Sequence, residues 1–173
     1  MKAYDLCIMI SASEAFNLNT IAQLLDRYHR GTQVFVDAIH SVSPAQVDAP
    51  PAPGKWSARQ IACHVADSEL VAGVRYRMIA AQPGSTLSAF DQEKWESQLH
   101  YPRQALPSTL GAFAAMRLYN LEMLRALPLD NWSRVAIHEE RGEYTLYGLV
   151  THNAAHVESH TAQILAIQVR FAG

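Results

Sequence analysis

Cysteine is scarce in this chain, and several other features that quickly assign a protein to a class are missing. The two cysteines, Cys7 and Cys63, have no CxxC spacing and are too few for a disulfide framework. No uninterrupted apolar run approaches the roughly 18–20 residues needed to cross a bilayer. The N-terminal stretch MKAYDLCIMISASEAF is a poor signal peptide, because Asp5 and Glu14 interrupt it. These absences predict a protein of the reducing cytoplasm without a membrane anchor.

Clustered positive charge is missing as well. The chain has 14 basic and 16 acidic residues and a formal charge of −2, with no basic run and no basic–aromatic cluster. Nucleic acids and anionic membranes are bound by clustered Lys and Arg, so neither is expected as a partner. The GxGxxG and Walker sequences of nucleotide sites are also absent. We therefore expect the partner to be a small molecule.

Long helical patterns fill most of the sequence. Its 173 residues fit one domain over 1–173. Ser57 and Gln60 form a capping box, and Pro44 and Pro128 end two helices. Four amphipathic helices without strand alternation predict an all-α four-helix bundle, whose topology the sequence leaves open. Such bundles often pair through exposed apolar faces, so a homodimer is also expected. The predicted helices, one of them short, cover about 18–42, 57–81, 88–98, 104–127 and 145–170.

Three of the eight histidines lie close together in the stretch THNAAHVESHTAQI. At about 100° per residue, His156 and His160 fall in the middle of the apolar face of the last helix, and His152 falls at its edge. Buried imidazoles are costly without partners. They are either core histidines bonded to neighbours or metal ligands, since residues one turn apart can bind the same ion. His64, at the edge of the apolar stripe of the second helix, is the candidate third ligand.

The segments GKWSARQIACHVADSE and HVESHTAQI resemble the DinB/YfiT-like family of metalloenzymes. The segments FDQEKW, FAAMR and DNWSR between them also fit, so the resemblance spans roughly residues 20–167. It implies a four-helix bundle that binds a divalent metal through His64, His156 and His160. Gln163 matches the glutamine that follows the histidine pair. The family often has Asp where this chain has Val157, a departure that affects a supporting contact and not a ligand.

Three neutral nitrogen ligands leave a coordination position open for water or a thiol, as in catalytic sites. The ligand types suit zinc or nickel best among the expected ions, and they do not select one metal. By the resemblance, the leading hypothesis is a thiol-dependent S-transferase that uses a low-molecular-weight thiol. One alternative is a metal-dependent hydrolase. Another is a metal-binding stress-response protein without catalysis.

The candidates for a catalytic side chain are Arg75, Asp91 and His152. Arg75 lies on the same side of its helix as His64, and either binds a substrate carboxylate or forms an ordinary ion pair, for example with Asp91. His152 lies outside the family pattern and is interpreted as a residue that lines the pocket or supports the ligands.

Other polar residues are expected to have structural roles. Glu158 lies within HVESH but projects away from both rings, so the HExxH arrangement of a hydrolase is absent. Glu69 and Arg117 are expected to pair with neighbours, and His138 is expected to be exposed to solvent. Cys63 is expected to be a small core residue and not a ligand.

Overall fold

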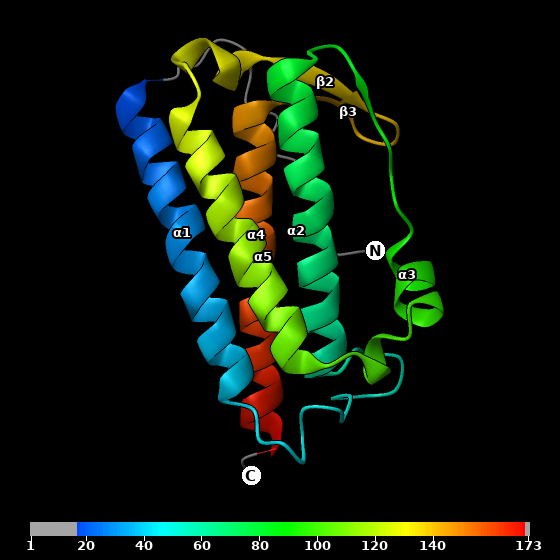
Figure 1. The fold of residues 1–173 in the computed structure, drawn as a ribbon. Coiled ribbons are helices and arrows are strands. Elements are labelled where there is room, and N and C mark those ends of the chain that lie inside the picture. Colours follow the sequence, from blue (N-terminus) through cyan, green and yellow to red (C-terminus); the bar gives the residue numbers. More distant parts are fainter. Residues whose placement is uncertain (1–16, 172–173) are drawn as a thin grey trace.

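Four long helices run side by side in the computed structural model, which describes residues 17–171 (Figure 1). The N-terminal stretch that the sequence analysis judged a poor signal peptide, including Cys7, lies outside the described residues. The predicted four-helix bundle is confirmed, with helix bounds within a few residues of those expected. The long helices are α1 Leu18–His40, α2 Ala58–Ala81, α4 Leu106–Ala126 and α5 Leu146–Phe171.

The helix ends follow local chemistry. Asn17 caps α1 by accepting a hydrogen bond from the backbone N–H of Thr20. The capping box predicted at the start of α2 is present, because Ser57 and Gln60 bond each other's backbone N–H groups. Pro107 lies in the first turn of α4, where a missing N–H costs nothing. These caps fix where each helix starts and therefore which residues share a level in the bundle.

The connection between α2 and α4 determines the topology. It passes through the short helix α3 Gln92–Gln98 and the 3-10 turn η1 Tyr101–Arg103, and it returns along the outside of the bundle (Figure 1). The helices α2 and α4 therefore run in the same direction. Both α1 and α2 pack against α4 and α5, and α5 runs antiparallel to α2. This arrangement places the helix of His64 next to the helix of the histidine pair.

A small three-stranded sheet lies at one end of the bundle, where the sequence analysis predicted no strands. β1 Thr86–Leu87 pairs parallel with β2 Val135–His138, which pairs antiparallel with β3 Gly142–Thr145. A 3-10 turn, η2 Leu129–Ser133, precedes β2. Strands this short show no readable alternation. Gly142 follows the turn of this hairpin, and its φ of 74° favours glycine.

The core has two apolar clusters with polar side chains between them. The first apolar cluster gathers around Tyr28, Tyr76 and Trp132, and the second around Phe35 and Phe113. On α2 and α4, buried polar residues lie between the residues of the two clusters, and Asn153 of α5 bonds to the same group. We call them the polar layer: Glu69, Arg117, Asn120 and Asn153. None of the helices in the described part of the chain is long and apolar enough to span a bilayer.

Candidate metal centre

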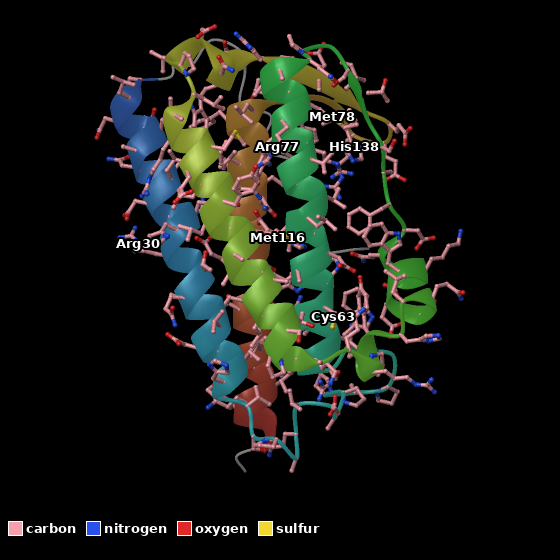
Figure 2. The ribbon with its side chains drawn as sticks, viewed as in Figure 1. Arg30, Cys63, Arg77, Met78, Met116 and His138 are labelled. Carbon is pink, nitrogen blue, oxygen red and sulfur yellow. The ribbon has the colours of Figure 1, made fainter. Side chains whose placement is uncertain are left out.

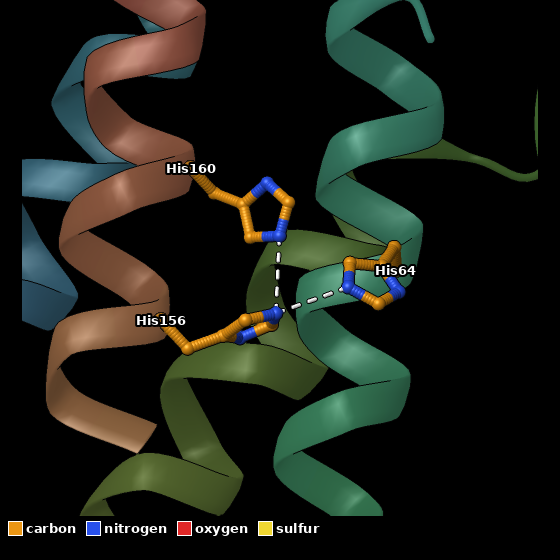
Figure 3. A group of neighbouring side chains, drawn as sticks. All are labelled: His64, His156 and His160. Carbon is orange, nitrogen blue, oxygen red and sulfur yellow. Dashed lines mark hydrogen bonds between the residues drawn. The ribbon is translucent and has the colours of Figure 1, made fainter. Parts of the chain in front are cut away.

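Three imidazole rings from two helices point toward one another (Figure 3). His64 comes from α2, and His156 and His160 come from α5. The Nε2 atom of His156 lies 3.1 Å from that of His64 and 3.0 Å from that of His160. One nitrogen of each ring lies within 4.8 Å of the others. The structure thus brings together the three histidines that the sequence analysis selected, which we call the histidine cluster.

The helices place these rings through simple geometry. His156 and His160 are one turn apart on α5, with ring centroids 4.5 Å apart. The antiparallel neighbour α2 brings the His64 ring to 5.1 Å from the His156 ring and 5.0 Å from the His160 ring. The Trp56 ring packs 5.0 Å from that of His64, and the Ser68 hydroxyl lies 3.5 Å from its Nε2. The ring of His64 therefore contacts both Trp56 and Ser68.

Burial keeps the histidine cluster neutral. His64 and His160 are buried, and His156 is half-buried. Loss of solvent, with a smaller effect from His160, lowers the pKa of His64 to about 3. Burial also lowers the pKa of His160, and burial with the neighbouring imidazoles lowers that of His156 well below its usual value. At neutral pH each ring therefore carries one nitrogen with a free lone pair.

Gln163 determines which nitrogen of His160 has the lone pair. The Nδ1 of His160 lies 3.0 Å from the amide oxygen of Gln163, which can only accept a hydrogen bond. The proton of the neutral ring is therefore on Nδ1, and the lone pair of Nε2 points into the cluster. This is the tautomer that a metal ligand needs.

The donor set fits a divalent metal ion. Tetrahedral ligands at about 2.0–2.1 Å from zinc lie about 3.3–3.4 Å from one another, within a few tenths of an ångström of the two Nε2 separations from His156. The Nδ1 of His64 is buried without a hydrogen-bond partner in the described part of the chain, so that ring lacks the outer support that His160 has. Neutral nitrogen donors suit zinc, nickel and similar ions.

A second polar group lies one turn toward the start of α5. The ring of His152 stacks on that of His156, with centroids 6.4 Å apart and an interplanar angle of 19°. Arg141, in the turn between β2 and β3, donates from Nη1 to the Nε2 of His152 over 3.3 Å. The ring of Tyr144 lies 6.2 Å from that of His152. His152 therefore borders the histidine cluster without pointing its Nε2 into it.

The prediction that His138 is exposed is wrong. His138 ends β2, and its side chain is only 6% exposed because β2 is the central strand of the sheet and packs against α2. Its Nδ1 accepts a hydrogen bond from the backbone N–H of Glu140 over 3.2 Å. Figure 2 shows His138 beside the upper part of α2. The sequence offered no sign of this burial, since the sheet was not predicted.

Arg75 and Asp91 have different partners and do not contact each other. Arg75 is half-buried and donates to the backbone carbonyl of Ser88. Asp91 caps α3 by accepting the N–H groups of Glu93 and Lys94, over 3.2 Å and 3.1 Å, and also pairs with the Lys94 ammonium at 3.5 Å. The suggested ion pair between Arg75 and Asp91 is not formed. The predicted catalytic roles of both residues stay predictions.

A carboxylate in the polar layer connects all four long helices. Glu69, on α2, accepts hydrogen bonds from Tyr28 of α1, from Asn120 at 2.7 Å and Arg117 at 3.3 Å on α4, and from Asn153 of α5 at 2.7 Å. The side chains of Glu69 and Arg117 are each 1% exposed. The sequence analysis expected both residues to pair, and it missed that Glu69 joins four helices. This network fixes the levels of α2 and α5 beside the histidine cluster.

The fold and the cluster define a class: helical bundles whose interior carries three histidines suited to a metal. Residues 27–164 match the model of the DinB superfamily. The chain belongs to that superfamily, which confirms the predicted family.

Curated relatives of similar length occur in bacilli. A protein of Bacillus cereus (strain 03BB102) is 27% identical over 135 residues, which cover 77% of this chain and 76% of the relative. A protein of Bacillus thuringiensis subsp. konkukian (strain 97-27) has the same identity and coverage. Both carry the name "Putative metal-dependent hydrolase".

Solved structures share the fold. YfiT from Bacillus subtilis, a four-helix bundle of unusual topology, matches with a TM-score of 0.85 and 18% identity over 92% of this chain and 91% of its own. The mycothiol-dependent maleylpyruvate isomerase matches with a TM-score of 0.68 and 12% identity, over 83% of this chain and 60% of its own. The four-helix bundle protein TT2238 has a TM-score of 0.59 and 20% identity, over 84% and 98%.

Proposed function

We propose that the histidine cluster binds a divalent metal ion, zinc or nickel, and that the protein transfers a small thiol to an electrophile. The observation that carries this proposal is the convergence of His64, His156 and His160 as three neutral nitrogen donors. When bound, the ion would supply a Lewis acid with an open position that lowers the pKa of a coordinated thiol. In the net reaction, the sulfur forms a bond to carbon, the leaving group departs with its electron pair, and the thiol proton goes to solvent.

The chain's own residues hold the donors in the productive form. Burial of His64 and His160 keeps both rings neutral, so protons do not compete for their lone pairs near pH 7. Gln163 keeps the proton of His160 on Nδ1. The hydroxyl of Ser68, one turn from His64, lies 3.5 Å from the Nε2 of that ring.

The surroundings of the cluster support thiol chemistry over hydrolysis. A hydrolase needs a general base close to the attacking water, often a carboxylate. Within residues 17–171 no carboxylate belongs to the cluster. Glu69 is held by four donors, and Glu158 pairs with Arg27 at 2.5 Å. Asp67 accepts a hydrogen bond from Tyr101 over 2.6 Å. A thiol deprotonated by a metal needs no such base.

Metal-dependent hydrolysis is the second candidate, and the names of the bacillary relatives favour it. The likeness in fold to a mycothiol-dependent isomerase is a precedent for thiol chemistry on this scaffold. Metal binding without turnover, as in a stress-response protein, is a third outcome that one experiment separates from the other two.

The test uses protein loaded with Co²⁺ in place of its own metal. Addition of 2-mercaptoethanol is expected to produce a sulfur-to-cobalt charge-transfer band, and a chromogenic aryl halide is expected to be converted to its thioether. The variant His156→Ala should lose both signals. Glu158→Gln changes a residue in the same HVESH stretch that faces Arg27, and it should keep both.

Each alternative has its own signature in this experiment. A charge-transfer band without thioether formation indicates binding without catalysis of this kind. Hydrolysis of an activated ester that is independent of thiol and lost in His156→Ala indicates the hydrolase. If the cobalt spectrum does not respond to the thiol, the transferase proposal is wrong.

A further inference from the structure

Two arginines from different elements lie at the turn between β2 and β3, and one of them contacts His152. Arg75 comes from α2, and Arg141 comes from the turn between β2 and β3. After burial, the positive charge of Arg141 is the next largest influence that lowers the pKa of Arg75. Arg141 donates to the Nε2 of His152 over 3.3 Å, and Arg75 donates to the carbonyl of Ser88, whose neighbour Ala89 donates its backbone N–H to Glu139 of the same turn as Arg141. We call Arg75 and Arg141 the arginine pair.

The positive charges of the arginine pair have no ion-pair partner within residues 17–171. Arg141 donates to the neutral ring of His152, and Arg75 donates to the carbonyl of Ser88 and lies 6.0 Å from the ring centre of Phe90. Neither guanidinium forms an ion pair with any residue of the described range 17–171. Most of their N–H donors are therefore available to another acceptor, because a guanidinium has five.

Two glutamates in the same turn do not take the place of an ion-pair partner. Glu139 and Glu140 are exposed, and Glu139 accepts the backbone N–H of Ala89 over 2.9 Å. Their attraction acts on Arg75, but each has a smaller effect than the repulsion by Arg141. Arg75 is half-buried and Arg141 is exposed, and a second positive charge near a half-buried guanidinium is unfavourable unless an anion joins the two.

The arginine pair adjoins the histidine cluster through His152. That ring accepts a hydrogen bond from Arg141 on one side and stacks on His156 on the other. Only the ring of His152 therefore separates Arg141 from the histidine cluster, so one molecule can contact both.

We propose that Arg75 and Arg141 bind an oxyanion, most simply a carboxylate, carried by the thiol or the electrophile that occupies the histidine cluster. Guanidinium groups bind carboxylate and phosphate through parallel N–H donors, which makes two converging arginines suited to one such group. The thiol part of this inference rests on the proposed function, whereas the anion site stands on the arginine pair alone. The substrate is therefore an anion whose charged group is separated from its reacting sulfur or carbon atom.

The test compares two probes that differ in charge at one end. Calorimetric titration at constant ionic strength measures the Kd of the purified protein for 6-mercaptohexanoate and for 6-mercaptohexanol. The charged thiol is expected to bind about tenfold or more tightly, the effect of one or two charge-assisted hydrogen bonds. Arg75→Gln and Arg141→Gln should each remove most of this difference and leave the Kd of the neutral thiol unchanged.

A matched control removes the same charge elsewhere. Arg30 is exposed on α1, on the side of the bundle away from His138, and pairs with Asp26 at 3.0 Å (Figure 2). Arg30→Gln should keep the difference between the two thiols. Hexanoate and inorganic phosphate, added as competitors, tell whether the arginine pair prefers a carboxylate or accepts any oxyanion, and competition by either one that depends on the arginines supports the proposal.

The outcomes separate this inference from the proposed function. If the two thiols bind equally well, or if the difference survives in both arginine variants, the anion site is wrong while thiol binding stands. If neither thiol binds but hexanoate or phosphate binds and requires the arginine pair, the anion site stands and the thiol function is wrong.

Discussion

At the scale of single residues, burial decides the charge of the side chains that matter for function. His64 is 2% exposed and His160 is 5% exposed, and a protonated imidazole in either place would lose its hydration. The pKa values of both are lowered for this reason, as is that of the more exposed His152. The same burial prepares the rings as ligands and makes the metal-free protein sensitive to acid.

The metal-free protein is expected to lose stability as the pH falls below about 6.5. The pKa of His64 is about 3 in the folded protein, against 6.5 as its ordinary value. Above pH 6.5 neither state is protonated, and the contribution to stability is complete. Between pH 6.5 and 3 only the unfolded chain takes up this proton, so the free energy of unfolding falls by about 1.4 kcal/mol per pH unit for each such histidine.

Urea unfolding of the metal-free protein at pH 7, 6 and 5 measures this slope. The shifts of His156 and His160 have the same direction, so the wild-type slope should exceed that of one histidine. His64→Gln should reduce the dependence of the free energy of unfolding on pH. A free energy of unfolding that does not change from pH 7 to pH 5 would contradict the burial of neutral imidazoles.

Removing the carboxylate of Glu69 is expected to be far more damaging than removing an exposed one. Glu69→Ala leaves Arg117 charged and buried without its partner, at a cost of about 3–5 kcal/mol. Glu122→Ala, at an exposed position on α4, should change stability by about 0.5 kcal/mol or less. Denaturant unfolding compares the two variants, and equal losses would show that the polar layer does not contribute as described.

At the scale of the helices, one glycine allows a close approach between α2 and α4. A Cβ at Gly73 would lie 2.7 Å from Nδ2 and 2.8 Å from Oδ1 of Asn120. Asn120 cannot move aside easily, because it donates to Glu69 and accepts from Arg77, both at 2.7 Å. Gly73→Ala should therefore destabilise the protein by about 1–3 kcal/mol, as overpacking does in other cores.

Gly111, inside α4, provides the matched comparison. A Cβ there meets no atom within 4 Å. Because alanine favours a helix over glycine, Gly111→Ala should stabilise the protein by about 0.5–1 kcal/mol. Thermal unfolding of both variants is the measurement, and the expected result is a shift of opposite sign. A lowered Tm for both would mean that the space around Gly111 is not open.

The helices could be predicted from the sequence, and the sheet could not. Apolar spacing, the Ser57 capping box and Pro128 place the long helices within a few residues of their bounds. The strands β1 and β2 pair across some fifty positions of the sequence, and β1 has only two residues. No local pattern carries that pairing. The burial of His138 depends on it and was missed for the same reason.

At the scale of the whole molecule, the return path through α3 places α2 beside α5 and therefore His64 beside His156 and His160. Helical spacing identified the residues of the pair and made His64 the candidate third ligand, and the family resemblance implied the same three residues. Distances between segments some ninety residues apart depend on topology, which the sequence left open. The four-helix network around Glu69 and the arginine pair are likewise properties of the assembled bundle.

The measurement that decides most is the metal content of protein purified without a metal-affinity tag. We expect about one divalent ion per chain, as for a single three-histidine site, in the wild type and in His29→Ala, which changes an exposed histidine of α1. His160→Ala, with its fold checked by circular dichroism, should contain almost none. Equal metal content in His160→Ala and the wild type would show that the histidine cluster is not the metal site.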